Sequence, residues 1–443
     1  MSDLERAADR AAAAVGGWLQ HGRAPRDLLA HDAALRGRPA AFRAAAALLV
    51  REAVAHRRRV EFALGGSAGL AGLAPRAHGA VLVVARLLEL RELPVAAGSV
   101  LLRQLGGPDG VDFGSLATAA DRTAAIAEPV QRLALGRSLP DWAAQRFVAT
   151  FGADADAVAT ALLEPPPRTI RANPLRIGDR DGLVRALAAE AVAATPARWA
   201  PFALHVAGHA DLFATASWAR GEFEQQDEAS QLGALAVAPP PGGAVLDLCA
   251  GTGGKTLALA AALQNRGRIL AVDVHERRLA ALRERCRRAG VDTVRALPID
   301  DGPLAGEVAA FARTADRVLV DAPCSGTGSW RRRPEGRWAI TAADLAELTA
   351  VQDTLLDRVA PLLQPGARLV YATCSLLPEE NEQRVAAALQ RWPQLEPVRL
   401  AEILGGAIAR PIADATGTYL SLRPDRHGCD GFFAAVLRRR RAG

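Results

Sequence analysis

The sequence has very little lysine, few cysteines and no long apolar run. Lysine occurs once in 443 residues, at position 255, so arginine supplies every other basic side chain. The five cysteines, at positions 249, 286, 324, 374 and 429, are odd in number and all lie beyond residue 248, which disfavours a disulfide framework. No Cys-x-x-Cys pair or Cys/His cluster has the spacing of zinc ligands, so we expect no metal.

No run of about 18 apolar residues is present, and the first ten residues, MSDLERAADR, carry acids where a signal peptide needs basic and then apolar residues. We therefore expect a cytoplasmic protein with no membrane partner. The formal net charge of +6 suits a polyanionic partner without requiring one.

The residue pattern divides the chain into three parts. Residues 1–140 are expected to be helical, because apolar residues recur at three-to-four spacing in 4–20, 40–64 and 74–92. The basic run HRRRVEF at 56–62 fits a solvated helix face better than a phosphate contact. A linker helix and a small α+β subdomain should occupy 141–236, and a third domain 237–443.

After residue 243, short apolar strands alternate with amphipathic helices. The segments AVLDLC, RILAVDV, DRVLVDA and ARLVYAT predict an α/β domain with a doubly wound parallel sheet. The residues that follow these strands should converge on one ligand crevice, because the carboxyl ends of parallel strands share an edge of the sheet.

A glycine-rich turn follows the first of these strands in VLDLCAGTGGKT, residues 245–256. It fits neither the dinucleotide fingerprint nor a phosphate-binding loop. Asp247, just before the turn, suits a cofactor with a positive amino-acid end, such as S-adenosylmethionine. Asp273 ends the next strand, where a carboxylate would bind ribose hydroxyls, and Asp300 or Asp301 would contact the adenine. The predicted cofactor loop consists of Cys249, Ala250, Gly251, Thr252, Gly253, Gly254 and Lys255.

Three segments, DLCAGTGGKT, DAPCSGTG and YATCSLLPEENE, closely resemble the RNA cytosine-5 methyltransferases of the Sun/RsmB type in order and spacing. The resemblance covers roughly residues 138–440 and implies a class I methyltransferase domain, of Rossmann-like fold, that uses S-adenosylmethionine. The glycine loop departs from the family's usual Ala-Ala-Pro at residues 250–252. Residues 1–140 are similar to the family's NusB-like RNA-binding domain in length and helical character.

The resemblance assigns roles to two of the cysteines. Carbon 5 of cytosine is a weak nucleophile, so a thiolate must first add to carbon 6. By resemblance Cys374 is this nucleophile and Cys324 assists release of the carbon-5 proton. Asp321 would hold the base and border the cofactor, with the charge of Lys255 close to it. We expect Cys249, Cys286 and Cys429 to be structural.

The sequence leaves open the roles of the tryptophans and arginines in residues 330–338, and the identity of the substrate. Trp330 and Trp338 are candidates for stacking on the target base or for the core, and the arginines at 331–333 are candidate phosphate contacts. The resemblance implies methylation of carbon 5 of a cytosine in RNA, with 16S ribosomal RNA as the expected partner. The alternatives are a tRNA or other RNA substrate, a non-catalytic ribosome-assembly protein that binds RNA, and a small-molecule methyltransferase.

Overall fold

The computed structural model describes residues 2–65, 70 and 72–441, which fall into two compact units. The helical unit consists of Met1–Pro165 together with Trp330–Ala342, and the catalytic unit consists of Pro166–Ser329 and Ala343–Gly443. Within the described ranges, no helix is long and apolar enough to cross a membrane. The units do not test whether residues 141–236 fold on their own, so the three-part division remains a prediction.

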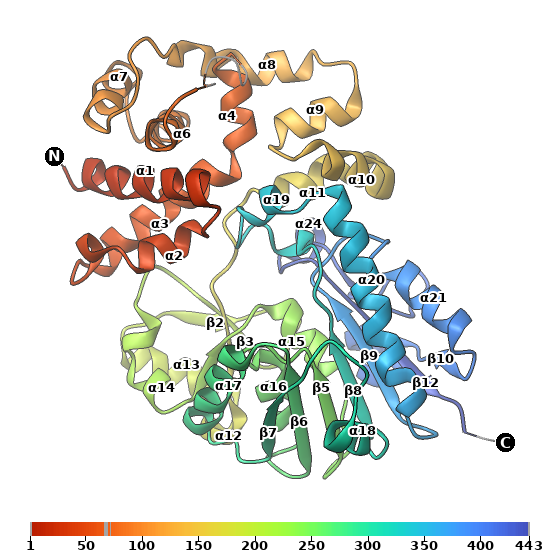
Figure 1. Ribbon diagram of the computed structural model, residues 1–443. Helices are drawn as coiled ribbons and strands as arrows, with labels where there is room; N and C mark the ends of the chain where they lie inside the picture. The colour runs from red at the N-terminus through yellow and green to blue at the C-terminus, as the bar shows by residue number, and fades with distance from the viewer. Residues whose placement is uncertain (1, 66–69, 71, 442–443) are drawn as a thin grey trace. The chain divides into compact units, whose positions relative to one another are not determined.

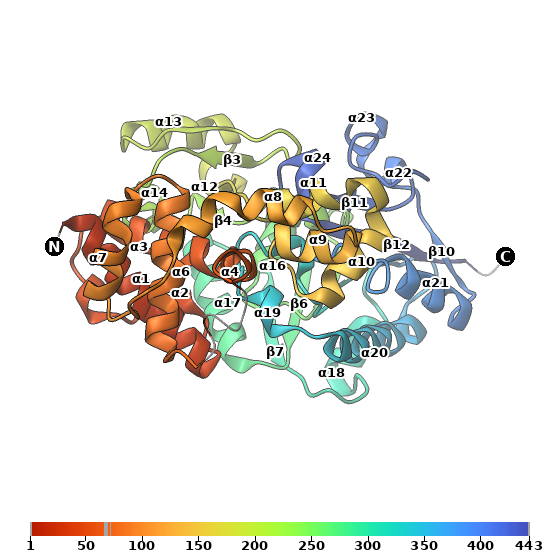
Figure 2. The same cartoon turned by 90° about the horizontal axis from the view of Figure 1, so that it is seen from above.

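The helical unit is built from short and medium helices (Figures 1 and 2). They are α1 (Asp3–His21), α2 (Pro25–Ala30), α3 (Ala40–Ala55), α4 (Arg57–Ala63), α6 (Pro75–Glu89), α7 (Val95–Gln104), α8 (Ala119–Ala124), α9 (Pro129–Gly136), α10 (Asp141–Phe151), α11 (Ala155–Ala161) and α19 (Gly336–Ala339). Helices α9, α10 and α11 lie together in both views. The helical character expected of residues 1–140 is therefore confirmed.

Helices α1 and α6 cross at a pair of glycines. Ser2 and Glu5 form a capping box at the start of α1. A Cβ added at Gly79 would lie 2.6 Å from the Ala12 carbonyl oxygen, and one at Gly16 would lie 2.8 Å from the Arg76 Cα. Only glycine permits this approach of the two backbones, which buries the alanine-rich face of α1 against α6.

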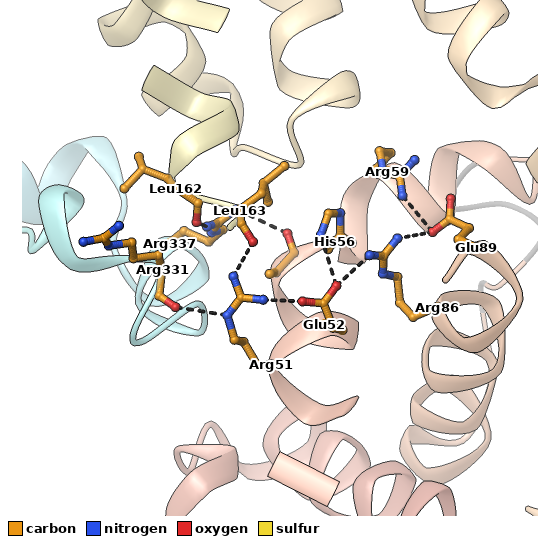
Figure 3. A network of polar contacts seen from close by, with 11 residues as sticks. Arg51, Glu52, His56, Arg59, Arg86, Glu89, Leu162, Leu163, Arg331 and Arg337 are labelled. Atoms are coloured by element: carbon orange, nitrogen blue, oxygen red, sulfur yellow. Dashed lines mark hydrogen bonds and ion pairs between the residues drawn. The ribbon is translucent and has the colours of Figure 1, made fainter. Parts of the chain in front are cut away.

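The segment Trp330–Ala342 completes the core of the helical unit. Trp330 is 1% exposed, stacks on Phe147 at 6.1 Å between ring centroids and meets Trp142 edge-on. Arg337 is fully buried, and its guanidinium donates to the carbonyl oxygens of Ala55, Ser138 and Leu162 at 3.2–3.3 Å. The three carbonyls come from three separate parts of the helical unit, so Arg337 connects these parts. Figure 3 shows Arg337 beside Leu162.

A buried ion network continues from this segment into α3, α4 and α6 (Figure 3). Arg51 donates to the Arg331 carbonyl at 3.2 Å and also pairs with Glu52. Glu52 accepts from Arg86 at 2.6 Å, and His56 Nε2 lies 3.5 Å from it. Burial, and then the charge of Arg86, hold the pKa of His56 well below its usual range, so His56 is the neutral member of this basic network.

The expectation of a solvated helix face at 56–62 is wrong. The helix breaks at His56, between α3 and α4. Arg58 then donates to the Leu139 carbonyl at 2.6 Å, and Arg59 pairs with Glu89 at 2.7 Å. Both arginines therefore make contacts inside the helical unit, because a backbone carbonyl and an acid that are distant in sequence lie beside them.

The catalytic unit begins with a small antiparallel sheet of order β2-β3-β1-β4. Its elements are β1 (Thr169–Ala172), α12 (Pro174–Ile177), α13 (Arg180–Ala189), β2 (Ala194–Pro196), β3 (Ala203–Val206), α14 (Ala216–Ala219) and β4 (Phe223–Gln225). Ile170, Leu183, Leu204 and Phe223 share a core of their own.

The main sheet has eight strands, in the order β10-β12-β9-β8-β5-β6-β7 with β11 paired to β12. Its strands are β5 (Ala244–Leu248), β6 (Arg268–Asp273), β7 (Val294–Pro298), β8 (Arg317–Asp321), β9 (Arg368–Thr373), β10 (Leu395–Pro397), β11 (Leu420–Leu422) and β12 (Phe432–Arg439). Strands β5 to β9 run parallel, whereas β12 is antiparallel to β9. The predicted α/β fold with four named strands is confirmed.

Helices cover both faces of this sheet (Figure 1). They are α15 (Glu228–Leu235), α16 (Gly254–Ala262), α17 (Glu276–Ala289), α18 (Gly306–Ala312), α20 (Ala342–Val359), α21 (Glu382–Arg391), α22 (Leu400–Leu404), α23 (Gly406–Ala409) and α24 (Pro424–His427). Helices α16 and α17 pack on the face that carries Ile269 and Ala271, and α18 and α20 on the face that carries Leu270 and Val272. This alternation along β6 leaves the carboxyl edge of the strands open to loops, which is where the site lies.

Candidate functional site

The glycine loop joins β5 to α16 through a turn that needs glycine. Cys249 has φ 69°, Gly251 φ 56° and Gly253 φ 85°, all in the left-handed region. A Cβ at Gly253 would lie 2.0 Å from Leu282 Cδ1, so the start of α16 can approach α17 only without a side chain there. The loop thus brings the backbone from the end of β5 directly into the first turn of α16.

Asp273 fastens this loop to the end of β6. It is 4% exposed; Oδ2 accepts from the Gly251 backbone N–H and Oδ1 from the His275 N–H, each at 2.8 Å. Thr252 is held from the other side, because Arg285 donates to its carbonyl at 2.6 Å. Asp300 and Asp301 follow β7, the strand next to β6, and are exposed. All the acids predicted for the cofactor site therefore lie at or just beyond the carboxyl ends of neighbouring parallel strands.

Asp247 carries a buried carboxylate oxygen without a partner. The residue is 1% exposed; Oδ2 accepts from Thr256 Oγ1 at 2.6 Å, and Oδ1 has no hydrogen bond to any residue that the structure describes. Burial raises the pKa of Asp247 to about 7. An orphaned carboxylate oxygen at the base of a glycine loop is suited to receive a cationic group of a ligand, which would favour its ionised form.

The single lysine of the chain faces Asp321. Lys255 Nζ lies 2.6 Å from Asp321 Oδ2, and the ammonium also lies 5.0 Å from the centroid of the Phe432 ring. The Lys255 side chain is 11% exposed and that of Asp321 is 32% exposed. The predicted closeness of these two charges is confirmed, and it orients the Asp321 carboxylate at the end of β8.

Cys324 and Cys374 come together after the neighbouring strands β8 and β9. Their Sγ atoms lie 3.4 Å apart. The hydrogen bond to Cys374, followed by burial, raises the pKa of Cys324 well above that of a free thiol. The same hydrogen bond lowers the pKa of Cys374. The pKa values of the two thiols thus shift in opposite directions, upward for Cys324 and downward for Cys374.

The other three cysteines lie outside this pair. Cys286 and Cys429 are buried in the core, at 7% and 1% exposed, which confirms the expectation that they are structural. Cys249 packs against the opposite face of the sheet, and burial raises its pKa to about 12. None of the three has the environment of a reactive thiol.

The candidate RNA contacts in Trp330–Ala342 are not where the sequence suggested. Trp330 belongs to the core of the helical unit, and Trp338 donates from Nε1 to the Val54 carbonyl at 3.0 Å. Arg331 is 3% exposed. The core is therefore the alternative that the structure supports for both tryptophans. A phosphate contact by Arg331 is not supported, because this arginine is buried in the helical unit.

Sequence reasoning missed a set of buried polar residues behind the two cysteines. Glu380 is fully buried and accepts hydrogen bonds from Ser325, Ser375 and Gln352. The available signal was an acid within PEENE, six residues after Cys374, in a segment otherwise expected to be a turn.

The strand order, the antiparallel β12 and the glycine loop after β5 define a class I methyltransferase domain. A family model described as 16S rRNA methyltransferase RsmB/F matches residues 234–438, and one described as an RsmF/B-like ferredoxin-like domain matches residues 139–212. A probable ribosomal RNA small subunit methyltransferase B of Bacillus subtilis is 33% identical over 318 residues, 71% of this chain and 70% of the relative. The chain belongs to the RsmB/F methyltransferase family.

Two solved structures agree with this fold. The crystal structure of PH0851 superposes with a TM-score of 0.78 over 99% of both chains, at 24% identity. A methyltransferase homologue protein from Pyrococcus horikoshii has a TM-score of 0.59 and 28% identity, over 71% of this chain and all of its own. The first likeness extends the shared fold to nearly the whole chain.

Proposed function

We propose that this protein transfers a methyl group from S-adenosylmethionine to carbon 5 of a cytosine in RNA, through a covalent bond between Cys374 and the base. The observation that carries the proposal is the thiol pair, 3.4 Å apart, with opposite pKa shifts. One thiol is prepared to attack as a thiolate while its neighbour keeps a proton. Transfer to an amino nitrogen would need neither group.

Cys374 opens the reaction by adding its thiolate to carbon 6 of the cytosine, which makes carbon 5 nucleophilic. S-adenosylmethionine, when bound, supplies a methyl group activated by its sulfonium. After carbon 5 is methylated, Cys324, having first given up its own proton to solvent, accepts the proton from carbon 5. The electron pair left on carbon 5 then expels the Cys374 thiolate as the carbon 6–sulfur bond breaks. Asp321, oriented by Lys255, holds the cytosine at N3 or the amino group.

The residues around the glycine loop fit S-adenosylmethionine. The orphaned Asp247 oxygen would accept from the amino group of its amino-acid end. Asp273 would accept from the ribose hydroxyls with its remaining lone pairs, and Asp300 or Asp301 would contact the adenine. The loop residues 249–255 would line the cofactor, and Asp321 would stand between cofactor and base.

The proposed substrate is the small-subunit 16S ribosomal RNA. The family description and the Bacillus subtilis relative's name support it. We expect the helical unit to contribute RNA binding, as in the NusB-like domains that it resembles in helical character.

Two experiments test the proposal. The first measures transfer of labelled methyl from S-adenosylmethionine to total RNA and to a small-molecule extract, and label in the extract alone would reject an RNA substrate. The second is bisulfite sequencing of rRNA and tRNA from a deletion strain. Loss of one 5-methylcytosine in 16S rRNA is expected. Loss of a 5-methylcytosine in tRNA instead would identify tRNA as the substrate. No loss in either RNA would reject cytosine-5 methylation.

A further inference from the structure

Glu380 lies behind both cysteines, and every hydrogen bond of its carboxylate leads to one of their turns, directly or through Gln352. We propose that Glu380 is the positioning residue of the thiol pair: its buried carboxylate fastens the turn that carries Cys324 to the turn that carries Cys374. The expected effect of Glu380 on methylation rests on the proposed function. The expected effect of Glu380 on the two thiols does not.

The carboxylate binds the residues next to both cysteines. Oε1 accepts from the Ser325 backbone N–H at 2.8 Å, and Oε2 accepts from Ser325 Oγ at 2.5 Å and from Ser375 Oγ. Ser325 directly follows Cys324, and Ser375 directly follows Cys374. Movement of either turn would therefore break hydrogen bonds to the Glu380 carboxylate, which also holds the other turn.

Gln352 of α20 supplies the other side of the Cys324 turn. Its Nε2 donates to Glu380 Oε1 and to the Pro323 carbonyl, each at 3.0 Å. Cys324 is thus held at the residue before it and at the residue after it. Gln352 is fully buried, so these bonds are protected from exchange with water.

Further bonds make the arrangement rigid from the β9 side. The Leu377 N–H donates to Ser375 Oγ at 3.1 Å, and the Tyr371 hydroxyl donates to the Glu380 carbonyl at 2.5 Å. Glu380 is thereby fixed through its backbone as well as its side chain. Both carboxylate oxygens of Glu380 and both serine hydroxyls are bonded, while Gln352 Oε1 has no hydrogen bond among the described residues. A buried network with these bonds favours one geometry of the two turns, in which the sulfur atoms lie 3.4 Å apart.

The charge of Glu380 also distinguishes the two thiols. Its donors are a backbone amide, a side-chain amide and two hydroxyls, none of them cationic, so the negative charge is not neutralised by an ion pair. Behind the hydrogen bond to Cys374 and burial, this charge adds to the raised pKa of Cys324. Cys374 instead faces Asp321, which raises its pKa, and Lys255, which lowers it.

The test compares Glu380→Gln and Glu380→Asp with the wild type and with Glu347→Gln, which removes the same charge from an exposed site on α20. Alkylation of Cys324 and Cys374 by iodoacetamide is followed against pH by peptide mass spectrometry, without RNA. In Glu380→Gln the alkylation profile of Cys324 should move to lower pH and approach that of Cys374. Glu380→Asp should keep two separate profiles, and Glu347→Gln should match the wild type.

Methylation supplies the second readout. Glu380→Gln and Glu380→Asp should lower kcat about 100-fold, because a misplacement of the thiols near 1 Å is costly, with little change in the KM for cofactor. Unchanged alkylation profiles and unchanged kcat in Glu380→Gln would overturn the inference. If the alkylation profile changes in Glu380→Gln but the wild type methylates no cytosine, the positioning role of Glu380 is supported and the proposed function is rejected.

If Glu380→Gln does not fold, Ser325→Ala and Ser375→Ala test the inference in its place. Each keeps the carboxylate and removes one hydroxyl that donates to it. Each should lower kcat, and the double variant should lower it further while leaving Cys324 the later thiol to ionise. If both single variants and the double variant methylate at the wild-type rate, the tether has no role.

Discussion

At the scale of single residues, the pKa values of the two thiols shift in opposite directions although the thiols occupy almost equivalent places, each after a parallel strand. The difference arises from their mutual hydrogen bond and from the unequal charges around them. Removing the attacking thiol and removing the thiol that assists release should therefore give different products.

Cys374→Ala should be inactive and form no covalent complex, because nothing else can add to carbon 6. Cys324→Ala should attack and methylate once, and then accumulate as a protein–RNA adduct that carries the methyl group and survives denaturing electrophoresis. An adduct trapped by Cys374→Ala and lost in Cys324→Ala would reverse the two assignments. Full turnover by both variants would reject covalent catalysis.

Asp247 gives the site a dependence on pH. Its pKa is raised by burial from 3.8 to about 7, so its contribution to stability is greatest at low pH and is lost as pH rises through about 7. A cationic ligand group requires the ionised carboxylate. S-adenosylmethionine should therefore bind about five- to tenfold more tightly at pH 7.5 than at pH 6, and take-up at pH 6 should release a proton.

Isothermal titration calorimetry at the two pH values, in buffers of different ionisation enthalpy, measures both quantities. Asp247→Asn should bind more weakly than the wild type at pH 7.5 and lose most of the pH dependence. Equal wild-type affinities with no proton release would exclude Asp247 from the cofactor's cationic end.

At the scale of elements, local patterns decided what the sequence could predict. The strands 244–248, 268–273, 317–321 and 368–373 are short apolar runs between turn residues, and the glycine loop needs its glycines for reasons within the loop and α17. The long helical pattern at 40–64 did not reveal the break at His56. The sequence left Trp330 and Trp338 open between base stacking and the core, because the partners of residues 330–338, such as Phe147 and the carbonyl of Ala55, lie far away in sequence.

Arg337 is expected to be the most costly of these residues to replace. Arg337→Leu leaves three buried carbonyl oxygens without donors, which should lower the free energy of unfolding of the helical unit by about 3 kcal/mol or more. Thermal unfolding followed by circular dichroism should show a lower midpoint. Arg23→Leu, on an exposed arginine of the same unit, is the control and should change little. Equal midpoints for the two variants would show that the three bonds add no stability.

At the scale of the whole molecule, the chain passes between the two units three times, at Pro165, at Ser329 and at Ala342. The second passage comes five residues after Cys324, so the segment that fills the helical core directly continues the turn that carries Cys324. Residue patterns alone do not reveal this connection. The three-part division predicted from residue patterns uses continuous stretches of sequence, whereas the helical unit takes part of its core from Trp330–Ala342.

Cutting the chain once should therefore not separate the units. With a specific protease site inserted between Pro165 and Pro166, the cleaved fragments should elute together on size-exclusion chromatography, because the first fragment stays packed around Trp330 and Arg337. The same cut in a Trp330→Ala, Arg337→Ala double variant should release the first fragment, since the segment then loses its ring stacking and its three hydrogen bonds. Separation of the wild-type fragments under native conditions would mean that residues 330–342 are dispensable to the helical core.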